Sequence, residues 1–183
     1  MSEHAEQFIA HLEGLRARDR GALAALRHSL AFDPGCYPKA FPYVERFAGA
    51  AAHERDARRL ALYLVAGLYA RHPQHQPGQS FAAAFGDLLH RRSKPKEPNK
   101  SIEGRFVALL GADAENLHEY LRQAISLLAA ENIGLNYARL LDDLTLWLNP
   151  GIDPARRDQK RQSWARDFYR AVQATTLETI DSK

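Results

Sequence analysis

The chain has 183 residues, 45% of them hydrophobic and 26% charged, with a net charge of +3, and it is long enough to bury one core or two small ones. Its single cysteine, Cys36, excludes an internal disulfide and any paired-cysteine metal or redox motif. The N-terminus has no signal-peptide pattern, and the longest apolar run, residues 60–70, is shorter than the roughly 20 residues that span a bilayer, so we expect a cytoplasmic protein without membrane contact.

The first half of the chain is predicted to be helical. Alanine and leucine are abundant and alternating runs of β-branched residues are scarce, which favours helix over strand. Apolar residues recur at helical spacing and predict helices at 3–18, from 20 onward, at 38–47, at 53–71 and from 81 onward. The helix 53–71 is apolar on nearly every side, so we expect it at the centre of a bundle. Ser80 is predicted to cap the helix that follows it.

A domain boundary is predicted at residues 93–100. The segment 91–100 holds no large apolar residue and contains Pro95 and Pro98, so it can neither add to a core nor continue a helix. We therefore expect an N-terminal helical bundle at 1–92, a linker at 93–100 and a C-terminal four-helix bundle at 101–183.

The residues after this boundary show the clearest helical periodicity. Ser101 is expected to cap the first of four helices, Asp113 the second and Asp153 the last, where Pro154 follows as the first helical residue. Four helices with short connections are the pattern of a four-helix bundle. Together the two halves predict an all-α fold made of two small helical bundles.

The last helix has cations where core residues are expected. Its apolar stripe includes Trp164 and Phe168, and the same spacing extended backwards reaches Arg157, Lys160 and Arg161. Unpaired cations are costly to bury, so this end of the helix would project beyond the core or face a groove, where a polyanion would stabilise it. The alternative is an exposed helix end whose side-chain stems lie over a neighbouring element, and the sequence leaves both open.

Positive charge is concentrated in three segments. Residues 16–28 have a net charge of +3 and residues 91–105 and 154–170 of +4 each, so the rest of the chain is acidic. Such a concentration is typical of a surface that binds a polyanion. For any one segment, arginines that only solvate the outer face of a helix are the simpler explanation.

No catalytic or metal-binding motif is recognisable. His53 and Glu54 lack the second histidine of a zinc-protease helix, and His72 and His75 have no cysteine or carboxylate near them in the sequence. There is no glycine-rich phosphate loop, and nothing beside Cys36 marks it as a nucleophile. We expect a protein that is not an enzyme and that has no cofactor and no metal.

Several motifs, taken in order along the chain, resemble those of one known family. They are 101–110 (SIEGRFVALL), 121–123 (LRQ), 136–144 (NYARLLDDL) followed by Trp147, and 164–169 (WARDFY). The early arginine-bearing segment 20–27 (RGALAALR) is similar to the family's pattern as well. On these motifs the chain resembles the CasB family, the small subunit of the type I-E CRISPR surveillance complex called Cascade.

The resemblance implies a role without catalysis. It implies an all-helical protein of two bundles that contacts the backbone and large Cascade subunits, the CRISPR RNA and a second copy of itself. It also implies contact with target DNA, stabilisation of the R-loop and binding of the displaced single strand through phosphates, without base recognition. Stacking aromatics are not predicted, because Trp147, Trp164 and Phe168 fall on core stripes.

Basic residues of the matched motifs and of the charged segments are the candidate nucleic-acid-binding residues. The resemblance assigns Arg20, Arg27, Arg105 and Arg122 individually and the start of the last helix as a cluster, and charge adds the others. The full set is Arg20, Arg27, Arg55, Lys94, Lys96, Lys100, Arg105, Arg122, Arg156, Arg157, Lys160 and Arg161.

Two alternatives to this assignment remain open. Arg105, Arg122 and Arg139 each accompany an apolar stripe and could instead pair with Glu119 or with the neighbours Asp142-Asp143. The protein could also be a helical adaptor whose basic segments bind an acidic protein partner. Salt dependence separates the two functions, because binding of nucleic acid weakens with salt in proportion to the phosphates that are neutralised.

Overall fold

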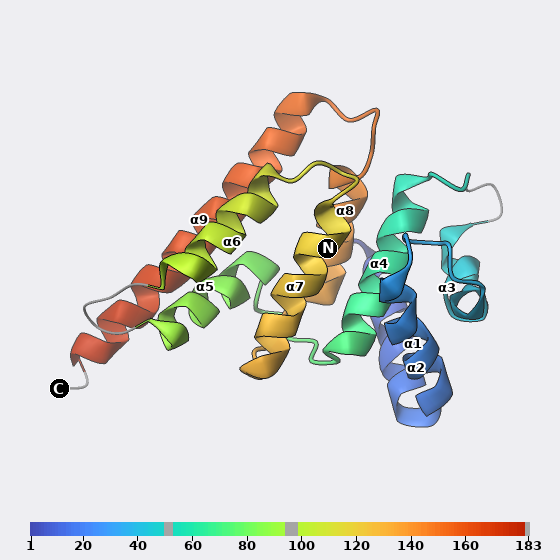
Figure 1. The fold of residues 1–183 in the computed structure, drawn as a ribbon, viewed down its shortest axis with the longest axis horizontal. Coiled ribbons are helices and arrows are strands. Elements are labelled where there is room, and N and C mark those ends of the chain that lie inside the picture. Colours follow the sequence, from blue (N-terminus) through green and yellow to red (C-terminus); the bar gives the residue numbers. More distant parts are fainter. Residues whose placement is uncertain (50–52, 94–98, 182–183) are drawn as a thin grey trace.

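The computed structural model describes residues 1–49, 53–93 and 99–181, those after 174 as backbone only. These residues form helices and no β-strand, so the predicted all-α fold is confirmed. The α-helices, labelled in Figure 1, are α1 (Glu3–Arg18), α2 (Arg20–His28), α3 (Phe41–Ala48), α4 (Ala57–Arg71), α5 (Phe81–Arg92), α6 (Lys100–Gly111), α7 (Leu117–Ala130), α8 (Tyr137–Trp147) and α9 (Pro154–Asp181). Two short 3₁₀ turns, η1 (Ser29–Ala31) and η2 (Pro38–Ala40), lie between α2 and α3.

Short polar side chains begin most of the helices. The Ser80 hydroxyl accepts a hydrogen bond from the first turn of α5 at 3.2 Å, which confirms its predicted cap. The predicted cap at Ser101 is wrong, because the Asn99 side chain accepts from the backbone at 3.3 Å and α6 begins before the serine. Asp113 does not cap α7 either: its carboxylate accepts from the backbone of the turn that precedes Leu117.

α4 is surrounded by helices of both halves of the chain, in agreement with the central position that its apolar sequence predicts. Every residue from Ala61 to Ala70 is buried, and α4 packs against α2, α3, α7 and α8. The close approach of α2 and η1 requires Gly67, because a Cβ there would lie 2.7 Å from the Leu30 side chain of η1 and 3.2 Å from the Leu26 carbonyl oxygen of α2. This packing fixes α2 relative to α4.

α5 packs along α9 (Figure 1), although the predicted linker 93–100 and the helices α6, α7 and α8 lie between them in the chain. A Cβ at Gly86 would lie 2.5 Å from the Phe168 carbonyl oxygen, so the two backbones are almost in contact. The rings of Phe106 and Phe168 stack with centroids 4.1 Å apart, which adds α6 to the same contact. By its packing, α5 belongs with the helices that follow it.

One hydrophobic core runs through the described helices on both sides of residues 93–100. Figure 1 shows α7 and α8 between the group α5, α6 and α9 and the group α1 to α4. α8 packs against α1, α4 and α9, and α7 against α4, α5 and α6. Helices of both halves contribute to this core. The division into domains 1–92 and 101–183 stays a prediction.

Candidate nucleic-acid interface

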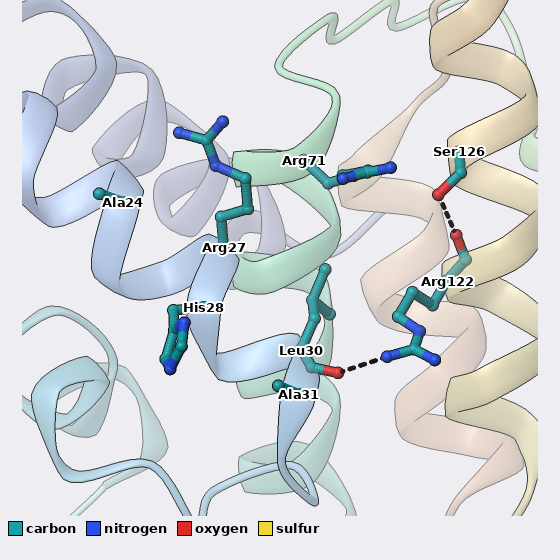
Figure 2. Close-up of a pocket in the computed structure, with 8 residues that line it drawn as sticks. All are labelled: Ala24, Arg27, His28, Leu30, Ala31, Arg71, Arg122 and Ser126. Carbon is teal, nitrogen blue, oxygen red and sulfur yellow. Dashed lines mark hydrogen bonds between the residues drawn. The ribbon is translucent and has the colours of Figure 1, made fainter.

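Three arginines from three helices line one hollow of the surface (Figure 2): Arg27 of α2, Arg71 at the end of α4 and Arg122 of α7. We call this hollow, of about 520 Å³, the arginine groove. Its lining residues are Ala24, Arg27, His28, Leu30, Ala31, Arg71, Arg122 and Ser126. None of these residues is acidic, so the charges that line the groove favour an anion.

The α2 wall of the groove presents Arg27 among small side chains. Arg20 lies two turns earlier on the same helix face, and both arginines are exposed. Ala24 lies between them on that face, and Ala31 of the following turn η1 also lines the groove. The predicted candidates Arg20 and Arg27 therefore share one open surface that leads into the groove.

Contacts within the protein position Arg122 in the groove. Its Nη1 donates a hydrogen bond to the Leu30 carbonyl oxygen at 3.3 Å, as Figure 2 shows, and its Nη2 pairs with Glu119 at 2.6 Å. The ion pair that the sequence left as an alternative is thus present. The two side chains are 40% and 42% exposed, and an exposed pair of this kind contributes only ~0–1 kcal/mol. The contacts orient the guanidinium and leave it accessible.

Arg71 is a groove residue that no sequence pattern singled out. It is the exposed last residue of α4, and its side chain extends toward α7 and Ser126 in Figure 2. A cation at a helix C-terminus interacts favourably with the helix dipole, which is the only role that its local sequence suggests. Its position beside Arg122 comes from the packing of α4 on α7, and a local pattern does not encode that packing.

The cations at the start of α9 have partners within the protein. Lys160 Nζ pairs with the buried Asp143 at 2.6 Å. Arg157 donates to a backbone carbonyl of the preceding loop at 3.1 Å, and the Arg161 guanidinium lies 5.4 Å from the centre of the Trp147 ring. The premise that these cations are unpaired is wrong for Lys160 and for Arg161, which also pairs with Asp158 at 3.2 Å. The contacts of all three favour the alternative in which their stems lie over neighbouring elements.

The remaining candidates lie outside the arginine groove. Arg105 is exposed and lines a separate hollow of about 340 Å³ between α6 and α7. Arg55 lines another, of about 810 Å³, between the start of α4 and the end of α8. Two candidates are exposed in the first turns of α6 and α9, namely Lys100 and Arg156. The last two, Lys94 and Lys96, lie outside the described residues.

Two further observations concern the described part of the chain. Nowhere in it do three or more His, Cys, Asp or Glu side chains form a group able to hold a metal ion. None of its helices combines the length and the hydropathy of a membrane span.

The helices that line the groove lie within or next to a stretch of the sequence that matches a known protein family. The sequence profile of the family described as CRISPR-associated protein Cse2 matches residues 22–169. The chain belongs to the Cse2 family. A CRISPR-associated protein Cse2 from Thermus thermophilus is 41% identical over 169 residues, which cover 91% of this chain and 90% of the relative. The resemblance to the CasB family that the motifs indicated is confirmed, because solved CasB structures match as well.

Solved structures show that this Cse2-family chain has the fold of its relatives. CasB from M. ruber is 33% identical and has a TM-score of 0.76, with 98% of this chain and 99% of that chain covered. A chain of a CRISPR RNA-guided surveillance complex has a TM-score of 0.77 over 97% of this chain and 98% of its own length. It is 19% identical, so that likeness concerns the fold alone.

Proposed function

We propose that this Cse2-family chain is a non-catalytic small subunit of a CRISPR RNA-guided surveillance complex, in which the arginine groove holds the displaced DNA strand. Membership of the family supports a place in such a complex. The observation that carries the proposed role is the convergence of Arg27, Arg71 and Arg122 on a hollow that has no acidic lining residue.

The groove suits a phosphate chain. A guanidinium group binds phosphate oxygens through two parallel hydrogen bonds. The Arg122 guanidinium is already oriented in the groove by its hydrogen bonds to Leu30 and Glu119. Along α2, Arg20 and Arg27 lie about 10 Å apart by helix rise, so they would contact different phosphates of one strand. Binding of this kind is independent of sequence and weakens steeply with salt.

The other proposed partners follow from the family. They are the CRISPR RNA, the target DNA of the R-loop, the backbone and large subunits and a second copy of this chain. Exposed cations outside the groove are proposed to contact these partners: Arg55, Lys100, Arg105 and Arg156. For Arg157, Lys160 and Arg161 we propose a mainly structural role, because each already has a partner in the protein.

Binding of a fluorescent single-stranded DNA of random sequence, titrated at several salt concentrations, tests the groove. The variant Arg27→Ala/Arg71→Ala removes two exposed groove cations. The matched control, Arg166→Ala/Arg170→Ala, removes two cations from α9, which does not line the groove. We expect the slope of log affinity against log salt to fall by about 0.7 for each phosphate that the groove variant no longer neutralises. The control should keep the wild-type slope.

Equal slopes for the two double variants would show that the groove is not where the strand binds. If the wild-type chain binds no strand at low salt but does bind a polyglutamate peptide, the helical adaptor that uses its basic surface on an acidic protein is supported instead. Circular dichroism of both variants checks that each is folded.

A further inference from the structure

An exposed aromatic cluster lies at one end of the arginine groove. It consists of His28, Phe32 and Tyr37. The rings of Phe32 and Tyr37 stack with centroids 4.9 Å apart and 19° between their planes. The His28 ring is tilted against both, 5.7 Å from Phe32 and 5.1 Å from Tyr37. Phe32 is 43% exposed and open to solvent, whereas Tyr37 is half-buried and packs against the hydrophobic core.

The aromatic cluster is continuous with the groove. His28 is itself a lining residue of the groove. Leu30 lines the groove and also a second, small cavity that Phe32 lines together with His118 of α7. The Leu30 carbonyl oxygen accepts the hydrogen bond from Arg122. A segment of a few residues thus carries both the contact that orients a groove arginine and the exposed ring.

A fixed turn holds the rings in this arrangement. Gly35 has φ +84°, in the left-handed region that favours glycine, and a Cβ there would lie 2.5 Å from Nη1 of Arg59. Arg59 is held in turn by Glu45, with 3.0 Å between Nε and Oε1. The hydrogen bond from Arg59 lowers the pKa of the Glu45 carboxyl, so this ion pair stays charged at neutral pH. The Arg59 side chain thus lies close against the turn between the two stacked rings, and the Cys36 N–H closes that turn by donating to the Asp33 carbonyl oxygen at 3.0 Å.

We infer that an unpaired base of the bound strand stacks on the Phe32 ring. The inference rests on the proposed function, because the groove arginines would hold the neighbouring phosphates. Every base has a π-face, so stacking on Phe32 requires no particular sequence. His28 and Tyr37 restrain the ring, which reduces the conformational entropy that the strand must remove on binding.

The ring was not foreseen among the aromatics of the sequence. Trp147, Trp164 and Phe168 are buried, as their stripes predict. Phe32, however, lies beside the turn 33–35, where helical periodicity assigns no face, so the reasoning that places the other three aromatics in the core does not apply to it. The inference therefore adds a base-stacking contact to a site that charge alone describes as a phosphate site.

Strands with and without bases separate stacking from phosphate binding. We would titrate the wild-type chain, Phe32→Ala, Phe32→Trp and the groove double variant with an oligodeoxythymidine and with an abasic strand of equal length, at the same salt concentration. The wild-type chain should bind the thymidine strand about fivefold or more tightly than the abasic strand. Phe32→Ala should bind both strands alike, whereas Phe32→Trp should retain the preference. The groove double variant should bind both strands more weakly by the same factor.

The outcomes distinguish this inference from the function on which it rests. If Phe32→Ala keeps the wild-type preference for the thymidine strand while the groove variant loses affinity, stacking on Phe32 is overturned and the phosphate groove stands. If the groove variant binds both strands as the wild-type chain does, the proposed function fails. A fluorescent thymidine analogue whose emission is quenched by stacking reports the contact directly. Its quenching is compared between the wild-type chain and Phe32→Ala, and equal quenching in the two would also overturn the stacking inference. Phe32→Ala removes the contact with Tyr37, so its melting temperature should fall by about 2–4 °C, and binding is compared at a temperature well below both transitions.

Discussion

Asp142 and Asp143 are neighbours in α8 that make two different contacts. Asp142 accepts hydrogen bonds from the Ser2 backbone N–H at 2.7 Å and from its hydroxyl at 2.6 Å. Asp143 is buried, accepts from the Trp164 indole N–H at 2.6 Å and pairs with Lys160 at 2.6 Å. Successive helix positions point about 100° apart, so one carboxylate fixes the start of α1 and the other fixes α9.

Asp143→Ala should destabilise the protein by about 2–3 kcal/mol. Removal of one member of a buried ion pair costs about 3–5 kcal/mol, and the Lys160 side chain, 26% exposed, can recover part of its hydration. Urea denaturation measures the free energy of unfolding. The neighbouring Asp142→Ala is the control and should cost about 1 kcal/mol or less, because it removes hydrogen bonds that are exposed. Equal losses in the two variants would contradict the assignment of Asp143 as the anchor of α9.

Some ion-pair and hydrogen-bond partners of the charged residues could be predicted from the sequence, and others could not. Glu119 is three positions from Arg122 on one helix, so their ion pair follows from helical spacing. The second Arg122 contact, with the Leu30 carbonyl oxygen, joins residues 92 positions apart. Likewise the sequence aligned Lys160 with the core stripe of α9, but the buried carboxylate that pairs with it comes from α8. Spacing determines the face on which a cation lies, whereas its partner depends on tertiary packing.

The contact between α5 and α9 rests on the absence of a side chain at Gly86. A Cβ there would lie 2.5 Å from the Phe168 carbonyl oxygen and 2.9 Å from the Ala171 Cβ. Backbone cannot move aside as a flexible side chain can, so the two helices must separate. We expect Gly86→Ala to lower the free energy of unfolding by about 1–3 kcal/mol, measured by urea denaturation.

A second glycine provides the matched control for this prediction. Gly104 lies inside α6, and a Cβ there would meet no heavy atom within 4 Å. Gly104→Ala should therefore stabilise the protein by about 1 kcal/mol through helix propensity alone. If both substitutions change the free energy of unfolding in the same direction, the effect of Gly86→Ala does not come from close packing against α9.

The sequence predicted where helices form more reliably than it predicted which helices pack against each other. The predicted first helix, 3–18, agrees with α1, and the end predicted at Arg71 agrees with α4. The caps at Ser101 and Asp113 were wrong because a nearby polar residue or turn made the competing hydrogen bond. For α5, the apolar face showed that it packs inward, but an amphipathic pattern does not specify which helix covers that face.

At the scale of the molecule, the arginine groove depends on contacts between the two halves of the chain. α2 and α4 come before residues 93–100 and α7 after them, and the groove exists only where α7 packs on α4. Arg27 and Arg71 belong to the predicted N-terminal bundle, whereas Arg122 belongs to the C-terminal one. The sequence identified Arg27 and Arg122 one at a time; that they face the same hollow is a property of the shared core.

The shared core predicts that the two halves unfold together. Both tryptophans, Trp147 and Trp164, lie in the C-terminal half with ring centroids 5.1 Å apart, so tryptophan fluorescence reports that half, whereas far-ultraviolet circular dichroism reports helices of the whole chain. In urea the two signals should give one coincident transition, as a cooperative unit does. A fluorescence transition separated from the dichroism transition would instead support bundles at 1–92 and 101–183 that fold independently. In that case the groove would be lost when the less stable half unfolds, and strand binding would end at the first of the two transitions while the other half keeps its helices.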